Sequence, residues 1–177
     1  MPGVGKAFAP CAISSFFEPI GAVSDEPLKR GARGGGFVID KGVYVEVEVS
    51  ESDRASIKTL LNGEEHDSFV ARRVVKKMME LKGDVYHVVV RQRVDAPIGA
   101  GCGTSGASAV AVGLAAARAL RLPLTYLGVG RIAHVSEVEC GTGLGTVIGV
   151  MTGGVGLVVE PGAPGIGVVD RLLVDDD

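Results

Sequence analysis

The chain has 177 residues, enough for one domain or one and a half. Hydrophobic residues make up 46% and charged residues 22%, which indicates a globular core and excludes a disordered chain. A net charge of −3 gives no reason to expect nucleic acid or an anionic membrane as a partner. The three cysteines show neither a disulfide framework nor a zinc spacing, and the apolar run 106–117 is too short to cross a bilayer. We therefore expect a cytoplasmic protein.

Strand patterns dominate the first 61 residues. Residues 6–14 predict a short first strand, followed by a loop that contains Phe16 and Phe17. Residues 30–36 predict a basic, glycine-rich turn, and 37–39 with 43–49 predict a hairpin whose second strand alternates valines with polar residues. Residues 56–61 predict a further strand, closed by a turn at Asn62 and Gly63.

Helical spacing begins after this turn. Residues 67–82 predict an amphipathic helix with Asp67 as its N-cap, Gly83 as its C-terminal stop and a solvated basic face at 72–77. The remaining pattern predicts, in order, a strand at 85–94, helices at 104–120 and 124–139, a glycine loop at 141–145 that leads into 146–151, and strands at 156–160 and 168–174. This order predicts an α+β fold rather than strict βαβ alternation.

The strongest functional signal is the glycine-rich segment 97–108, which lies between a predicted strand and a predicted helix. Glycines let successive backbone N–H groups converge on one point, and the helix adds unpaired N–H groups and the positive end of its dipole. Thr104 and Ser105 supply hydroxyls that can cap the helix, bind phosphate or reach Mg²⁺. The segment lacks the Lys of a Walker A loop and the third glycine of a Rossmann fingerprint. We expect a triphosphate site, with a tight strand-to-helix turn as the alternative.

The pattern Pro-x-Gly-x-Gly-x-Gly-Thr-Ser-Gly-Ala at 97–107 resembles the phosphate-binding motif of the GHMP kinases. Together with segments 9–17, 31–37 and 133–145, it is most similar to the archaeal pantoate kinases of that superfamily. The resemblance covers nearly all of the chain. It implies a ribosomal-protein-S5-like N-terminal, ATP-binding domain over 1–165, with 166–177 as the start of a C-terminal region or a frayed end. The ferredoxin-like C-terminal domain of such kinases is expected to be absent.

The resemblance implies ATP- and Mg²⁺-dependent phosphorylation of a small molecule, pantoate, to 4-phosphopantoate on the route to coenzyme A. The implied nucleotide contacts come from the loop and the start of the helix: Pro97, Gly99, Gly101, Gly103, Thr104, Ser105 and Gly106. Ser105 is also the expected Mg²⁺ ligand, with Glu137 or Glu139 as the metal carboxylate. His134 is a further catalytic candidate, with a structural histidine as the alternative.

Thr146 stands where many members of the superfamily carry an Asp that accepts the substrate proton. A Thr hydroxyl is not a general base at neutral pH. Two interpretations stay open. Transfer proceeds without a protein base, because a loose phosphoryl-transfer transition state needs mainly positioning and charge stabilisation, or the activity is impaired.

The pantoate carboxylate requires a cation or amide donors. Arg33 is the expected clamp, because arginine binds carboxylates in a planar, bidentate way, and Arg30 and Lys29 are the alternatives. Ser14 and Ser15 are expected to hydrogen-bond the substrate.

Phe16 and Phe17 are expected to pack in the core, with a wall of the substrate pocket as the alternative. Two other functions stay open for the whole chain. One is a GHMP kinase for another small alcohol of the homoserine or mevalonate type. The other is a truncated, non-catalytic nucleotide-binding module, with a homodimer as a further expectation.

Overall fold

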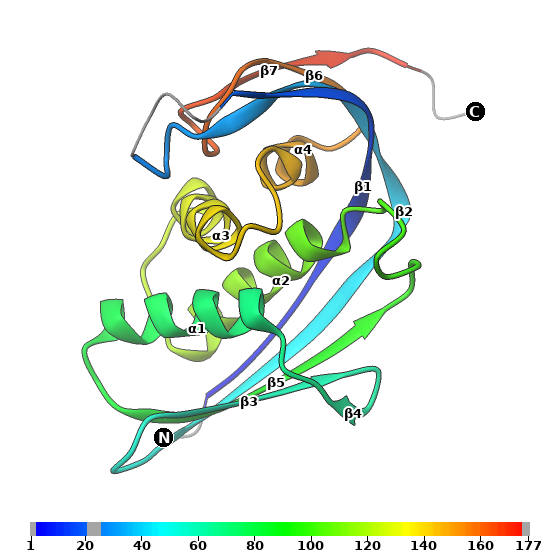
Figure 1. Cartoon of the computed structure of the whole chain (residues 1–177). Helices are drawn as coiled ribbons and strands as arrows, with labels where there is room; N and C mark the ends of the chain where they lie inside the picture. The colour runs from blue at the N-terminus through cyan, green and yellow to red at the C-terminus, as the bar shows by residue number, and fades with distance from the viewer. Residues whose placement is uncertain (1–2, 21–25, 175–177) are drawn as a thin grey trace.

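One curved sheet encloses a group of helices in the computed structural model, which describes residues 3–20 and 26–174 (Figure 1). In the described chain the strands are β1 (Gly3–Ile20), β2 (Gly31–Glu51), β3 (Ser56–Leu61), β4 (Glu64–Glu65), β5 (Tyr86–Val94), β6 (Val155–Glu160) and β7 (Val168–Leu172). Their order is β4-β3-β5-β2-β6-β7, with β1 paired to β2. All neighbours are antiparallel except β3 and β5, which the helix between them connects as a parallel pair.

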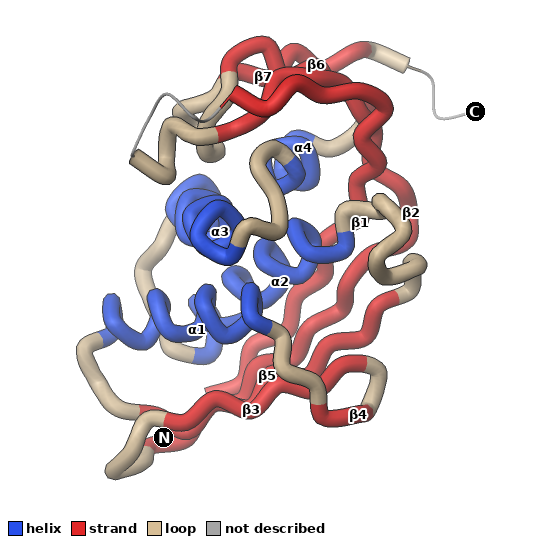
Figure 2. The backbone as a smooth tube through the Cα atoms, viewed as in Figure 1, coloured by secondary structure: helices blue, strands red, loops and turns tan. Residues whose placement is uncertain are grey.

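The helices are α1 (Phe69–Lys82), α2 (Thr104–Ala119), α3 (Tyr126–Cys140) and α4 (Thr146–Thr152). They lie on one side of the sheet, and the strands wrap around them (Figure 2). The predicted α+β fold is confirmed. No helix in the described ranges is long and apolar enough to cross a membrane.

The first two strands form one long hairpin, and here the sequence-based prediction was wrong. β1 pairs with β2 from Gly3 opposite Val49 to Ile20 opposite Gly31. The expected Phe-Phe loop, residues 31–36 of the expected turn and the expected hairpin at 37–49 are therefore strand. The glycines at 34–36 serve close packing rather than a turn. A Cβ on Gly35 would lie 3.0 Å from the ring of Phe16, and one on Gly34 would collide with the main chain of β1.

Helix α2 packs directly on β1, with no side chain between the two backbones at Gly3 and Gly5. A Cβ on Gly3 or Gly5 would collide with the carbonyls of Ala119 and Ala115 on α2. The alanine-rich face of the helix is therefore buried against the strand. This packing holds the C-terminal half of α2 against β1.

Local signals around α1 were mostly read correctly. Gly83 ends the helix in the left-handed conformation and donates to the Met79 carbonyl, as predicted. The prediction of Asp67 as the N-cap was wrong: Ser68 holds that position, and Asp67 forms an ion pair with Arg72 at 2.5 Å. Toward the end of the described chain, β7 pairs antiparallel with β6.

Candidate active site

The glycine loop between β5 and α2 has the backbone of an anion site. Gly99, Gly101 and Gly103 have φ angles of 77°, 78° and 63°, a left-handed conformation at every second residue. Such alternation turns successive N–H groups toward one side of the chain. A side chain at Gly99 or Gly101 would meet no atom within 4 Å, so these two glycines are needed for their backbone angles rather than for space.

The first turn of α2 continues this site. Gly103 occupies the N-cap position and supplies no side-chain cap, so the first N–H groups of the helix remain unpaired within it. No acidic residue lies in the first turn. The helix start therefore favours a bound anion, through both its N–H groups and its dipole.

A buried carboxylate faces this turn. Glu137 on α3 is 2% exposed and accepts hydrogen bonds at Oε1 from the hydroxyls of Ser105 (2.5 Å) and Thr142 (3.0 Å). Burial raises the pKa of Glu137, and the two hydroxyl bonds partly oppose that rise because they favour the charged form.

Two glycines lie directly against the second oxygen of Glu137. A Cβ on Gly106 would lie 3.1 Å from Oε2, and one on Gly143 would collide with it. Gly143 was part of a recognised motif, but sequence reasoning gave it no role, because only the fold brings it against the carboxylate. The pattern Thr142-Gly143, five residues after a glutamate, is the signal that could have found it.

The residues fit a Mg²⁺ ion bound together with nucleotide phosphates. The described residues contain no group of three or more His, Cys, Asp or Glu side chains that could hold a metal by themselves. A single carboxylate beside a hydroxyl, Glu137 and Ser105, matches the sparse oxygen ligation that Mg²⁺ accepts when phosphates complete its shell.

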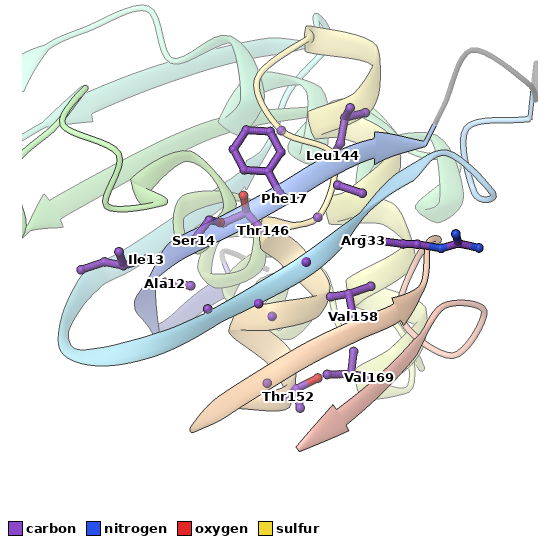
Figure 3. Close-up of a pocket in the computed structure, with 18 of the residues that line it drawn as sticks. Ala12, Ile13, Ser14, Phe17, Arg33, Leu144, Thr146, Thr152, Val158 and Val169 are labelled. Atoms are coloured by element: carbon purple, nitrogen blue, oxygen red, sulfur yellow. The ribbon is translucent and has the colours of Figure 1, made fainter. Parts of the chain in front are cut away.

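Beside the helix start lies a cavity of about 500 Å³ (Figure 3). It is lined mainly by residues of β1, β2, α4, β6 and β7 and of the loop before α4, together with Arg30 just before β2 and Val138 on α3. Thr146 lines this cavity and also contacts the glycine loop. Its Cγ2 lies 2.6 Å from the position of a Cβ on Gly106 and 2.9 Å from one on Gly103. The anion site and the cavity therefore meet at Thr146.

The cavity lining carries two charged side chains among the described residues, Arg30 and Arg33, and both are cations. Arg33 is exposed, and its side chain extends away from the other labelled residues (Figure 3). Arg30 is partly buried, and its Nε has no hydrogen-bond partner in the described part of the chain. The arrangement gives the cavity a positive potential.

The other substrate candidates divide. Ser14 lines the cavity, whereas Ser15 falls in an irregularity of the β1–β2 pairing and is absent from the described lining. Phe16 and Phe17 are 62% and 66% exposed and line the cavity, so the expectation that they pack in the core was wrong. Phe16 and Phe17 pair with Gly35 and Gly34 on β2, which have no side chains that could cover the rings.

His134 is 1% exposed, and its Nε2 donates to the carbonyls of Arg30 (2.9 Å) and Pro27 (3.2 Å). Burial lowers the pKa of this imidazole, although the two carbonyl bonds oppose the shift. These contacts are those of a structural histidine, and His134 is not among the described residues of the cavity wall. Its catalytic role stays a prediction.

Glu139 lies away from the helix start. Its carboxylate pairs with Lys77 at 2.9 Å and with Arg73 at 3.6 Å on α1. Part of the basic face of α1, expected to be solvated, is therefore used to join α1 to α3. Of the two glutamates, only Glu137 contacts Ser105.

The class of protein follows from comparison with known families and structures. Residues 69–154 match the sequence profile of the GHMP kinases N terminal domain. The chain superposes on a solved "Phosphotransferase related to CoA biosynthesis pathway" with a TM-score of 0.88 and 34% identity, over 98% of this chain and 58% of that one. Mevalonate diphosphate decarboxylase from Staphylococcus aureus shares the fold, at a TM-score of 0.71 and 17% identity, over 99% of this chain and 52% of that one. The chain carries the N-terminal domain of a GHMP kinase.

Its curated relatives are pantoate kinases. The protein from Thermococcus kodakarensis is 37% identical over an alignment of 180 positions, which covers 97% of this chain and 57% of the relative. The protein from Methanocaldococcus jannaschii is 34% identical over 96% of this chain and 58% of the relative. The predicted resemblance to the pantoate kinases is confirmed, and the chain spans less than three fifths of these relatives.

Proposed function

We propose that this chain binds ATP and pantoate and supports phosphorylation of pantoate to 4-phosphopantoate on the route to coenzyme A. The observation that carries the proposal is the buried Glu137 carboxylate, bonded to Ser105 at the uncapped start of α2. That pair lies next to a cavity whose described charged residues are cationic. The similarity to curated pantoate kinases supports the choice of acceptor.

The nucleotide phosphates belong at the glycine loop and the first turn of α2. Backbone N–H groups of the loop and of Thr104, Ser105 and Gly106 supply the donors, and the helix dipole adds positive potential. Ser105 and Glu137 would hold Mg²⁺, which neutralises charge on the transferred phosphoryl group. Binding of a cation favours the ionised form of Glu137 and offsets the effect of burial on its pKa.

Transfer needs no protein base in this proposal. The acceptor hydroxyl oxygen forms a bond to the γ-phosphorus, the bond to the ADP oxygen breaks, and the hydroxyl proton leaves on the transferred phosphoryl group. Thr146 lies between the loop and the cavity and supplies a hydroxyl for positioning. The rate enhancement comes from alignment and charge stabilisation.

The chemistry of pantoate matches the described lining of the cavity. Its carbon with two methyl groups suits the apolar side chains, which are Ile13, Leu144, Val158 and Val169. Its hydroxyls suit Ser14 and Thr152, and its carboxylate suits an arginine.

A coupled ADP-release assay with ATP and Mg²⁺ tests the proposal, with pantoate, homoserine and mevalonate offered in turn. We expect turnover with pantoate and its loss in Glu137→Gln. Turnover with homoserine or mevalonate alone would overturn the choice of acceptor.

Calorimetric titration of MgATP into the same proteins provides a second readout. We expect weaker binding to Glu137→Gln than to the unmodified chain, with Glu139→Gln as the matched control. Nucleotide binding without turnover on any acceptor would support the alternative function, a non-catalytic nucleotide-binding module, which Thr146 in place of an acid favours.

A further inference from the structure

We propose that Arg30, rather than the Arg33 expected from the sequence, binds the anionic group of the acceptor in the cavity. The inference rests on the proposed function, because it names a specificity-determining residue in the same cavity. It is carried by the guanidinium of Arg30, which lines the cavity and has no hydrogen-bond or ion-pair partner among the described residues, and by the charge of the cavity lining.

An arginine with a buried, unpaired donor is costly unless something binds it. Nε of Arg30 is the one buried side-chain nitrogen or oxygen without a partner in the part of the chain that the structure describes. Buried donors in folded proteins are nearly always satisfied, so this exception marks Arg30 as a residue whose guanidinium lacks a counter-group. Because Nε itself has almost no accessible surface, the two terminal nitrogens are the donors that can meet the two oxygens of one carboxylate in the cavity.

No acid of the described chain competes for this guanidinium. The described cavity lining contains no Asp or Glu. Glu26 pairs with Lys29 at 2.8 Å, and Glu137 is bonded to hydroxyls at the helix start. The group that pairs with the Arg30 guanidinium therefore comes from outside these residues, and we infer that it is a small anion.

The backbone of Arg30 is held firmly, as a preorganised binding residue requires. Its carbonyl accepts the hydrogen bond from the buried ring of His134, which bridges to Pro27 as well. On its other side, a Cβ on Gly31 would lie 2.6 Å from the nitrogen of Gly162, so the two segments touch there. We assign His134 as a positioning residue for Arg30.

Helix α3 connects the two halves of the site. His134 holds the backbone of Arg30, and Glu137, three residues further on, faces Ser105. Residues three apart lie on the same side of a helix. One rigid element therefore sets both the anion site for the acceptor and the carboxylate for the metal.

Calorimetric titration of pantoate into the unmodified chain, Arg30→Gln and Arg33→Gln tests the inference directly, without any requirement for turnover. Loss of a charge-assisted bidentate pair predicts binding weakened by roughly ten- to a hundredfold in Arg30→Gln. Arg33→Gln is the matched control, and we expect a change of less than about threefold, because exposed charges contribute little. Pantolactone, the uncharged lactone of pantoate, should bind the unmodified chain and Arg30→Gln alike. Thermal unfolding of each variant verifies that the fold is intact.

Three results would overturn the inference. The first is equal pantoate affinity of Arg30→Gln and the unmodified chain, and the second is a loss of pantoate affinity in Arg33→Gln alone. The third is that inorganic phosphate competes with pantoate while Arg30→Gln weakens the binding of pantolactone and pantoate equally. If pantoate does not bind, homoserine, mevalonate and lactate are titrated next. Arg30-dependent binding of one of these retains the anion site while the proposed acceptor fails. Absence of binding for all four rejects the anion site.

His134→Gln separates positioning from stability. Its amide can still donate to the carbonyls, so we expect pantoate affinity near that of the unmodified chain. His134→Ala should weaken pantoate binding while MgATP binding is retained. Equal loss of both ligands in His134→Ala would contradict the positioning role.

Discussion

Substitution of Gly106 by Ala tests the contact between the glycine loop and the cavity. The new Cβ would lie 2.6 Å from Cγ2 and 2.8 Å from Cβ of Thr146, closer than side chains approach in proteins. The Cβ of Thr146 is attached directly to the backbone of α4, so rotation of the side chain cannot remove both contacts. Overpacking of this kind costs about 1–3 kcal/mol, and the better helix propensity of alanine returns less than about 1 kcal/mol. We expect Gly106→Ala to lower the free energy of unfolding by about 1–2 kcal/mol.

The matched control is Gly149→Ala. Gly149 lies inside α4, and a Cβ there would meet no atom within 4 Å, so alanine should stabilise the chain by about 0.5–1 kcal/mol. Urea unfolding followed by circular dichroism at 25 °C measures both variants.

A double-mutant cycle with Thr146→Ser isolates the contact, because serine keeps the hydroxyl and removes Cγ2. Gly106→Ala should cost less in the Thr146→Ser background. Two results would refute the reasoning. One is an equal free energy of unfolding for Gly106→Ala and Gly149→Ala, and the other is an equal cost of Gly106→Ala with Thr146 and with Thr146→Ser.

Three further predictions concern the buried polar groups. The pKa of Glu137 is raised in the folded chain, so without Mg²⁺ stability should fall as pH rises from about 4.3, the ordinary glutamate value, through the raised pKa. Glu137→Gln should flatten that part of the profile, which denaturant unfolding at a series of pH values measures. The pKa of His134 is lowered, so stability should instead fall as pH drops below about 6.5, and His134→Gln should remove this dependence. A pH profile unchanged by either substitution would contradict the burial of that group. Ser105→Ala removes a bond to the ionised form of Glu137 and should raise its pKa further, which carboxyl NMR titration detects. The same variant should weaken MgATP binding, and retained affinity would remove Ser105 from the proposed metal site.

Local chemistry explains where sequence reasoning succeeded. The α1 C-cap at Gly83, the turn at Asn62 and Gly63, and the glycine loop before α2 all depend on backbone angles set by a few neighbouring residues. The loop sequence alone also predicts an anion site, because the glycines with left-handed backbone angles and the helix start are contiguous in the chain. These features are therefore readable without knowledge of the fold.

The glycines of β2 show the limit of such reasoning. A run of three glycines with nearby arginines is typical of a turn, but here it allows β1 and the Phe16 ring to approach the strand. Whether a glycine serves its own backbone angle or a neighbour's space depends on what packs against it. That neighbour, Phe16, is about 20 residues away in sequence and is known only from the fold.

The sequence by itself determined the α+β class, the glycine loop, the family and the candidates for each role. Only the tertiary structure showed which of those candidates lie together. Glu137 and Glu139 are two residues apart on one helix, so they point to different neighbours, one to Ser105 and the other to α1. The arginines at 30 and 33 are equal as sequence, but of the two only Arg30 is partly buried, and its Nε is the buried donor without a partner in the described chain. The reason is that a side chain's partners are set by long-range packing, which no local pattern records.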